Sequence, residues 1–169
     1  MLLHKQESYY DDFCVELEFR PRRKGYEAGV TVWWSMYSHA SIGVTAVEVD
    51  GKIVTTVVIK KPTGTAAKME TMHPLLSNEG TGIAAEEQGF DDSAPFHISA
   101  KASPTTYTLA LSQGKTVAEC IFSAEDLTIM PPNGGAFTGT MFGIYSFGNW
   151  EPVLDPADFR NICIRDHES

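Results

Sequence analysis

Apolar and polar residues alternate with a period of two along most of the chain. In residues 13–19, four apolar side chains alternate with a cysteine and two glutamates. Successive side chains of a β-strand point to opposite faces of the sheet, so this pattern predicts a half-buried strand. Comparable patterns predict further strands at residues 30–37, 41–49, 52–60, 96–100, 107–111, 117–122, 138–147 and 159–164.

Turn signals separate these stretches. Asp50-Gly51 lies between two β-branched stretches and predicts a hairpin, because a type I′ turn needs positive φ at both central positions. Residues 62–92 are rich in Gly, Thr, Ala and Glu, which predicts loops around short strands near residues 69–75 and 81–86. Ser123 is a candidate N-cap for one helical turn at residues 124–127.

The number and spacing of the strands indicate the fold class. Roughly nine or ten short strands, with turn signals about every 8–12 residues, favour an all-β, two-sheet antiparallel sandwich. A closed barrel is the alternative. With 169 residues, the chain has the length of one domain, which we place at residues 1–169.

Composition and charge narrow the classes of partner. The chain is 43% hydrophobic and 21% charged, which excludes a disordered or collagen-like protein. Its formal net charge is −9, whereas nucleic acids and anionic membranes attract proteins with a cationic surface. We therefore expect neither a nucleic-acid nor a membrane partner.

The cysteines and the N-terminal residues bear on cellular location. Cys14, Cys120 and Cys163 are far apart and show no zinc-ligand spacing, so we expect reduced, mostly buried thiols. The first ten residues lack the apolar segment of a signal peptide. These features predict a cytoplasmic protein, or a secreted one if the N-terminus is truncated.

Acidic residues are the candidates for catalytic or metal chemistry, because the sequence contains no nucleophile-elbow or zinc-protease motif. Glu16 and Glu18 share one strand face, where they could act as a pair of catalytic carboxylates, although a solvated face is the favoured interpretation. Asp155 and Asp158 are candidate calcium ligands, but they lack EF-hand spacing. We expect no other cofactor.

Aromatic residues outside the core pattern suggest carbohydrate binding. Trp33 and Tyr37 are predicted to share one strand face, and Trp34 lies on the other. Trp150 follows the last aromatic strand, next to a Gly-Asn turn. Sugar rings stack on such side chains through their apolar C–H faces, which makes Trp33, Tyr37 and Trp150 candidate binding residues. Packing in the sandwich core is the alternative.

Several short motifs resemble a known family. Phe19-Arg20-Pro21 followed by Glu27-Ala28-Gly29, the segment Gly135–Gly139 followed by Phe142-Gly143, and Ala157-Asp158-Phe159 occur in the family's order. The chain resembles the concanavalin A-like C-terminal domain of family 43 glycoside hydrolases, the β-xylosidases and α-arabinofuranosidases. This resemblance implies a jelly-roll sandwich. It also implies that catalysis belongs to a preceding five-bladed β-propeller, so no catalytic residue is assigned to this chain.

The resemblance also implies two finer features. In some relatives an aromatic loop residue of the sandwich reaches the sugar pocket of the propeller, and Phe137 is the candidate for that role. The family sandwich normally has strands before the segment that resembles Leu3–Gln6, so this chain is expected to lack them and to leave an unpaired sheet edge.

Three functions follow from these observations. The leading hypothesis is a non-catalytic accessory module that braces a glycosidase propeller and helps to shape its sugar pocket, with xylan- or arabinan-derived saccharides as further ligands. The alternative is a free-standing, lectin-like carbohydrate-binding domain. The third is a sandwich glycosidase that uses Glu16 and Glu18.

Overall fold

The computed structural model describes residues 1–74, 90–114, 116–132, 139–152 and 154–166. These residues form strands and one short helix, α1 (Ala124–Leu127). The strands are β1 (Leu2–Lys5), β2 (Asp11–Phe19), β3 (Glu27–Ser35), β4 (Ser38–Val49), β5 (Lys52–Pro62), β6 (Met69–Met72), β7 (Phe96–Ala102), β8 (Thr106–Gln113), β9 (Thr116–Ser123), β10 (Met141–Phe147) and β11 (Ala157–Asp166).

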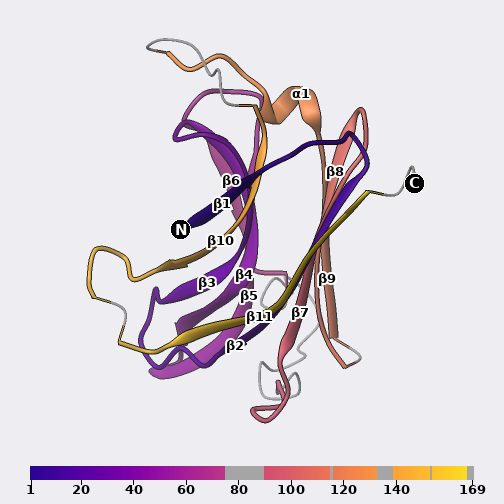
Figure 1. Ribbon diagram of the computed structural model, residues 1–169. Coiled ribbons are helices and arrows are strands. Elements are labelled where there is room, and N and C mark those ends of the chain that lie inside the picture. The colour runs from indigo at the N-terminus through magenta and orange to yellow at the C-terminus, as the bar shows by residue number, and fades with distance from the viewer. Residues whose placement is uncertain (75–89, 115, 133–138, 153, 167–169) are drawn as a thin grey trace.

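The strands form two antiparallel sheets that pack face to face (Figure 1). Sheet A has six strands in the order β1-β10-β3-β4-β5-β6, and sheet B has five in the order β11-β2-β7-β8-β9. In Figure 1, sheet A lies on the left and sheet B on the right. The architecture confirms the predicted two-sheet sandwich rather than the closed barrel.

The core lies between the sheets, where the period-two pattern places the apolar side chains. In β2, the side chains of Phe13, Val15, Leu17 and Phe19 are at most 3% exposed. In sheet A, alternate residues of β3 and β4 are buried in the same cluster. The buried face of each sheet thus follows directly from the alternation, as predicted.

Local turn and cap signals also correspond to the structure. Asp50 and Gly51 both have positive φ, at 50° and 76°, and they join β4 to β5. The hydroxyl of Ser123 accepts a hydrogen bond from the backbone N–H of Glu125 at 3.1 Å and so caps α1. The strand predicted near residues 69–75 is β6, whereas the one near 81–86 lies outside the described residues.

One side of the sandwich is bounded by two edge strands, β1 of sheet A and β11 of sheet B. Between them lies an apolar groove of about 230 Å³. Leu2 and Leu3 line the groove from β1, and Ile162 and Ile164 line it from β11. The expectation that this chain lacks the first strands of the family sandwich stays a prediction. Within the described part of the chain, no helix is long and apolar enough to cross a membrane.

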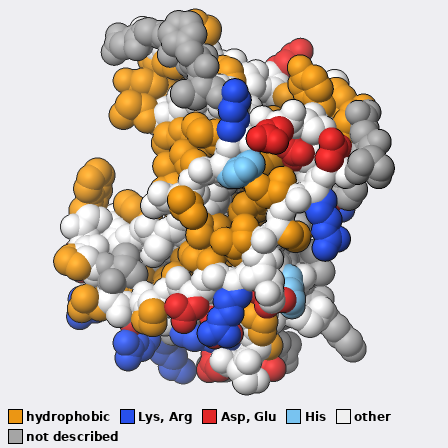
Figure 2. Space-filling model, viewed as in Figure 1, with side chains coloured by type: hydrophobic (Ala, Val, Ile, Leu, Met, Phe, Trp, Pro, Cys, Tyr) orange, Lys and Arg blue, Asp and Glu red, His pale blue; other side chains and the backbone are white. Residues whose placement is uncertain are grey.

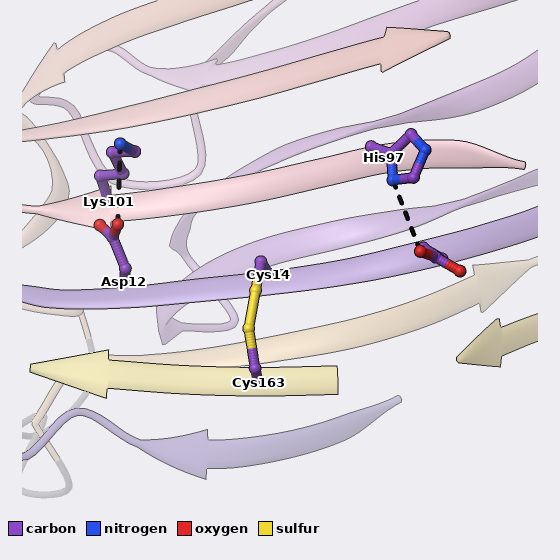
Figure 3. The surroundings of a disulfide bond; sticks show 6 residues. Asp12, Cys14, His97, Lys101 and Cys163 are labelled. Carbon is purple, nitrogen blue, oxygen red and sulfur yellow. Dashed lines mark ion pairs between the residues drawn. A yellow bond between two sulfur atoms is a disulfide. The ribbon is translucent and has the colours of Figure 1, made fainter. Parts of the chain in front are cut away.

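A disulfide joins the two sequence-distant strands β2 and β11 (Figure 3). Cys14 and Cys163 are 149 residues apart in sequence, but they lie directly opposite each other in the antiparallel register, with Cα atoms 5.2 Å apart. On the other side of β2, Asp12 forms an ion pair with Lys101 of β7 at 3.6 Å. The prediction of reduced thiols is therefore wrong for Cys14 and Cys163, because strand pairing brings them together. Cys120 is a free, buried thiol.

Reducing the Cys14–Cys163 disulfide should lower the free energy of unfolding by about 2–4 kcal/mol, because the bond restricts the unfolded chain across a long loop. Guanidinium unfolding of the protein with and without reductant measures this change. Cys14→Ser is the matched control, since its unfolding midpoint should not respond to reductant. Equal midpoints for the oxidised and reduced wild-type protein would contradict the prediction.

Candidate functional site

A pocket of about 330 Å³ lies on the outer face of sheet A, the face turned away from sheet B. Figure 2 shows that the molecule is hollowed on this side. Val30 and Val32 of β3 are buried in the core, so Thr31 and Trp33, which alternate with them, belong to the outer face. The pocket is lined by Met1, Thr31, Trp33, His39, Ser41, Lys60, Tyr145, Ser146 and Phe147. We call it the sheet A pocket.

Two glycines leave room on this outer face. Gly29 of β3 and Gly43 of β4 lie opposite each other in the register. A Cβ atom on Gly43 would lie 2.9 Å from the hydroxyl oxygen of Tyr145 and would also clash with the backbone of Ala28. The absence of a side chain at Gly43 therefore lets Tyr145 lie across β3, with its hydroxyl beside β4.

Tyr145 reaches a buried carboxylate. The Tyr145 hydroxyl donates a hydrogen bond of 2.6 Å to Oε1 of Glu27, whose side chain is 7% exposed. Lys60 Nζ donates to both carboxylate oxygens at 2.8 Å. These three residues, the Glu27 network, connect β10, β3 and β5. A buried charge is tolerated only when it is paired and hydrogen-bonded, and Glu27 meets both conditions.

The Glu27 network keeps Tyr145 protonated. Burial raises the pKa of the Tyr145 hydroxyl well above its ordinary value, and the negative charge of Glu27 and the hydrogen bond to it act in the same direction. A hydrogen bond with Ser41 lowers this pKa, but it is the smallest of the four effects. Tyr145 is therefore a neutral hydrogen-bond donor at any physiological pH.

His39 and Trp33 form one wall of the pocket. Their rings are stacked, with centroids 5.1 Å apart and an interplanar angle of 26°. Burial lowers the pKa of His39, and the positive charge of Lys60 lowers it further, while Glu27 partly opposes this. The ring nitrogen Nδ1 of His39 is buried and has no hydrogen-bond partner among the described residues. His39 is therefore a neutral imidazole with an unsatisfied polar atom at neutral pH.

Aromatic residues at the end of β10 form the rim. Phe147 lines the pocket, and its ring centroid lies 5.7 Å from Lys60 Nζ and 6.4 Å from the centroid of the Trp150 ring. Trp150 is 95% exposed. Asn149 and Trp150 both have positive φ, at 51° and 71°, a conformation that is unfavourable for bulky residues. The chain thus presents an exposed indole beside the pocket at a cost in backbone strain.

The predicted saccharide-binding residues do not all lie at the sheet A pocket. Trp33 lines the sheet A pocket, whereas Trp150 packs edge-on against Phe147, which lines it. Tyr37 does not share a strand face with Trp33, because the register shifts after Trp33 and β3 ends at Ser35. Tyr37 instead lies in the turn between β3 and β4. Phe137 lies outside the described residues.

The candidate calcium ligand Asp155 is bound by an arginine. The backbone N–H of Arg22 donates to Oδ2 of Asp155 and its Nε donates to Oδ1, both at 2.8 Å. The backbone hydrogen bond is the main cause of the lowered pKa of Asp155, and the Arg22 side chain and its charge add to it. Asp158 lies opposite Glu18 in the register of β11 and β2. Among the described residues, no group of three metal-ligating side chains occurs. Calcium binding here stays a prediction.

The acidic pair Glu16 and Glu18 lies on the outer face of sheet B, where Glu16 lines a second hollow of about 550 Å³ and Glu18 lines a separate one of about 460 Å³. Asn161 donates a hydrogen bond of 2.8 Å to Glu16, and His97 lies 3.8 Å from the same carboxylate. Glu18 pairs with Arg160 at 2.9 Å. Small side chains, among them Ser99 and Ala110, line the larger hollow. Each carboxylate therefore has its own polar partner on a partly solvated surface.

Sequence reasoning missed His39 and Lys60, which line the pocket, and Glu27, which binds Lys60. Lys60 is the last residue of the strand predicted at residues 52–60. Glu27 occurs in the Glu-Ala-Gly motif that carries the family resemblance. The motif was the available signal, because it places a carboxylate two residues before a glycine on one strand face.

The chain belongs to a known domain family. A family model described as the β-xylosidase C-terminal concanavalin A-like domain matches residues 1–165. The fold and the family resemblance predicted from the sequence are thereby confirmed. No curated protein matches the chain.

Solved structures of family 43 proteins share the fold. The xylan β-1,4-xylosidase of Bacillus halodurans C-125 superposes with a TM-score of 0.71 at 16% identity, over 95% of this chain and 28% of that chain. GH43B of the xyloglucan utilisation locus of Bacteroides ovatus gives 0.66 at 20% identity, again over 95% and 28%. A bifunctional GH43-CE protein of Bacteroides eggerthii gives 0.63 at 16% identity, over 97% and 18%. The chain thus spans less than a third of the length of these proteins.

Tyr145→Phe should lower the free energy of unfolding by about 1.5–3 kcal/mol, because it removes a hydrogen bond to a buried carboxylate. Chemical denaturation measures the change. The control is Tyr9→Phe, since Tyr9 is 71% exposed and its substitution should alter stability by less than about 0.5 kcal/mol. Equal stability of the wild-type protein and Tyr145→Phe would contradict the Glu27 network.

His39 should make the protein less stable as the pH falls below the ordinary histidine pKa of about 6.5. The pKa of His39 is lowered in the folded state, so in this window the unfolded chain binds a proton that the folded chain excludes. The free energy of unfolding is therefore retained above about pH 6.5 and decreases on acidification. Thermal unfolding across this range should show a shallower pH dependence for His39→Gln. Parallel pH profiles would contradict this assignment.

Proposed function

We propose that the chain is a non-catalytic accessory module of a family 43 glycosidase, where it braces the catalytic propeller. One observation carries the proposal: the family of C-terminal domains matches residues 1–165, and the chain spans only 28% of the xylosidase that it superposes on. The partner implied by this arrangement is the catalytic domain of such an enzyme.

The positions of the acidic residues support a non-catalytic role. Glycoside hydrolysis needs two carboxyl groups that flank one bond. Glu16 and Glu18 are instead engaged by Asn161 and Arg160, respectively, on the outer surface of sheet B. Glu27 is buried and bound by Tyr145 and Lys60, so it offers no free carboxylate to a substrate.

The surface around β1 suits contact with a preceding domain. In an enzyme whose sandwich is C-terminal, the catalytic domain joins at the β1 end. Met1 and Leu2 are 65% and 67% exposed there, next to the apolar groove between β1 and β11. Covering these side chains would remove apolar surface from water and cover an open sheet edge. A contribution of Phe137 to the sugar pocket of the propeller belongs to the same proposal.

The disulfide bears on cellular location. Structural disulfides persist in oxidising compartments and are rare in the cytosol. The Cys14–Cys163 bond therefore supports a secreted or periplasmic location rather than the cytoplasmic one expected from the N-terminal residues.

The proposal predicts that the chain binds a family 43 catalytic domain of its source organism and has no hydrolase activity alone. Three samples are compared by gel filtration and with aryl β-xyloside and aryl α-arabinofuranoside: the chain, the catalytic domain, and both. We expect co-elution of the pair and a higher thermal midpoint for the catalytic domain. Only samples that contain the catalytic domain should release the aryl group.

A double variant is the control for hidden catalysis. The variant Glu16→Gln combined with Glu18→Gln should form the same complex with the catalytic domain as the wild-type chain. The hydrolase activity of that complex should be unchanged. Turnover by the isolated chain, lost in this variant, would instead support the sandwich-glycosidase hypothesis. If the chain binds none of the catalytic domains tested, the accessory role is wrong.

A further inference from the structure

We infer that the sheet A pocket is a binding site for a neutral saccharide, with Trp33 in its wall and Trp150 at its rim as the stacking surfaces. This inference goes beyond the proposed function, because binding by the pocket requires no catalytic domain. It rests on the shape of the pocket, its charge balance, its unsatisfied polar atom and its strained aromatic rim.

The pocket is formed by central strands of sheet A and exists without a bound ligand. Its walls come from β3, β4, β5 and β10, which are adjacent strands of sheet A. Gly29 and Gly43 remove side-chain bulk from the outer face, and the Glu27 network holds Tyr145 and Lys60 in place. The volume of about 330 Å³ lies at the lower end of the range for small-molecule sites, which is about 300–1,000 Å³. A small ligand therefore fits without rearrangement of the backbone.

The charge balance favours a neutral ligand. Lys60 is the one cationic side chain among the described residues that line the pocket, and both oxygens of Glu27 already accept its hydrogen bonds. His39 is neutral at neutral pH, because burial lowers its pKa. A charged ligand would lose its hydration on binding, and no unpaired charge of opposite sign in the lining would compensate for this loss.

The lining combines aromatic rings with polar groups, as saccharide recognition requires. A sugar ring has apolar C–H faces that pack on aromatic side chains and hydroxyl groups at its edge that need hydrogen-bond partners. Trp33 and Phe147 provide aromatic surface, and Ser41 provides a hydroxyl on the same face of the sheet. Nδ1 of His39 is buried without a partner among the described residues, and such an atom gains stability from a hydrogen bond.

The rim provides an independent indication. Trp150 is almost fully exposed, and it and Asn149 adopt left-handed backbone conformations that cost free energy. Its ring packs edge-on against Phe147, which lines the pocket. Strain that persists at an exposed tryptophan beside a pocket is typical of a ligand-contacting residue rather than of a core residue.

The chain contains three tryptophans, which makes an internal control available. Trp34 packs against the core, and its indole N–H donates a hydrogen bond of 2.8 Å to the carbonyl of Ile129, away from the lining of the pocket. In ¹⁵N-labelled protein each tryptophan gives one indole N–H signal, which substitution of that tryptophan assigns. Titration with xylotriose or arabinotriose should shift the Trp33 and Trp150 signals saturably and leave Trp34 unchanged.

Variants then test the roles of the two rings. Trp33→Ala and Trp150→Ala should each weaken xylotriose or arabinotriose binding by about 2- to 12-fold in calorimetry, the range that one aromatic contact provides. Tyr9→Ala removes an exposed aromatic residue outside the pocket and should bind like wild type. Circular dichroism and thermal unfolding check that each variant is folded. If Trp33→Ala does not fold, Trp150→Ala alone provides the binding test.

Two results would overturn the inference. One is the absence of saturable indole shifts with both saccharides in wild-type protein. The other is undiminished binding by a folded Trp150→Ala or Trp33→Ala variant. If the Trp33 signal responds only to an added catalytic domain, the pocket is a protein interface instead. Failure of the saccharide titration leaves the gel-filtration test of the accessory role unaffected, so the two proposals fail separately.

Discussion

The outer face of sheet A is organised around one buried charge. Glu27 lies at the start of β3, where the period-two alternation directs it away from the core, yet its side chain is only 7% exposed. Its carboxylate therefore needs partners, which Lys60 of β5 and Tyr145 of β10 provide. Tyr145 can reach it only because Gly43 has no side chain. The floor of the sheet A pocket thus depends on this carboxylate and on the glycine beside the Tyr145 hydroxyl.

The family relationship and the pocket address different parts of the function. Membership in a family of C-terminal domains defines the enzymes in which this sandwich occurs, but solved structures at 16–20% identity establish only its fold. The chemistry of a site has to come from its own side chains. In sheet B those side chains are paired acids beside small residues, and in sheet A they are aromatic rings around a compensated ion pair. The second arrangement is the one suited to a small neutral ligand.

Sequence reasoning succeeded where a local rule applies. Alternation located most of the strands and their buried faces, Asp50-Gly51 located a hairpin, and Ser123 located a helix cap. Alternation failed after Trp33, because the strand register shifts there and Tyr37 lies in a turn. It also could not pair Cys14 with Cys163, because a strand pairing across almost the whole chain has no local signature. Trp33 and Trp150 were recognised as candidates, but not the polar residues around them.

The sequence by itself determined the all-β class, the core faces of the strands and the family, since these depend on side-chain periodicity and short motifs. Only the tertiary structure decided which distant residues meet. The order of strands in sheet A brings Glu27, Lys60 and Tyr145 together, and the order in sheet B joins the two ends of the chain through Cys14 and Cys163. In both cases a strand from near the end of the sequence, β10 or β11, pairs with a strand from near its start, β3 or β2. Pairing of that kind is selected by the packing of the whole sandwich and not by any local stretch of residues.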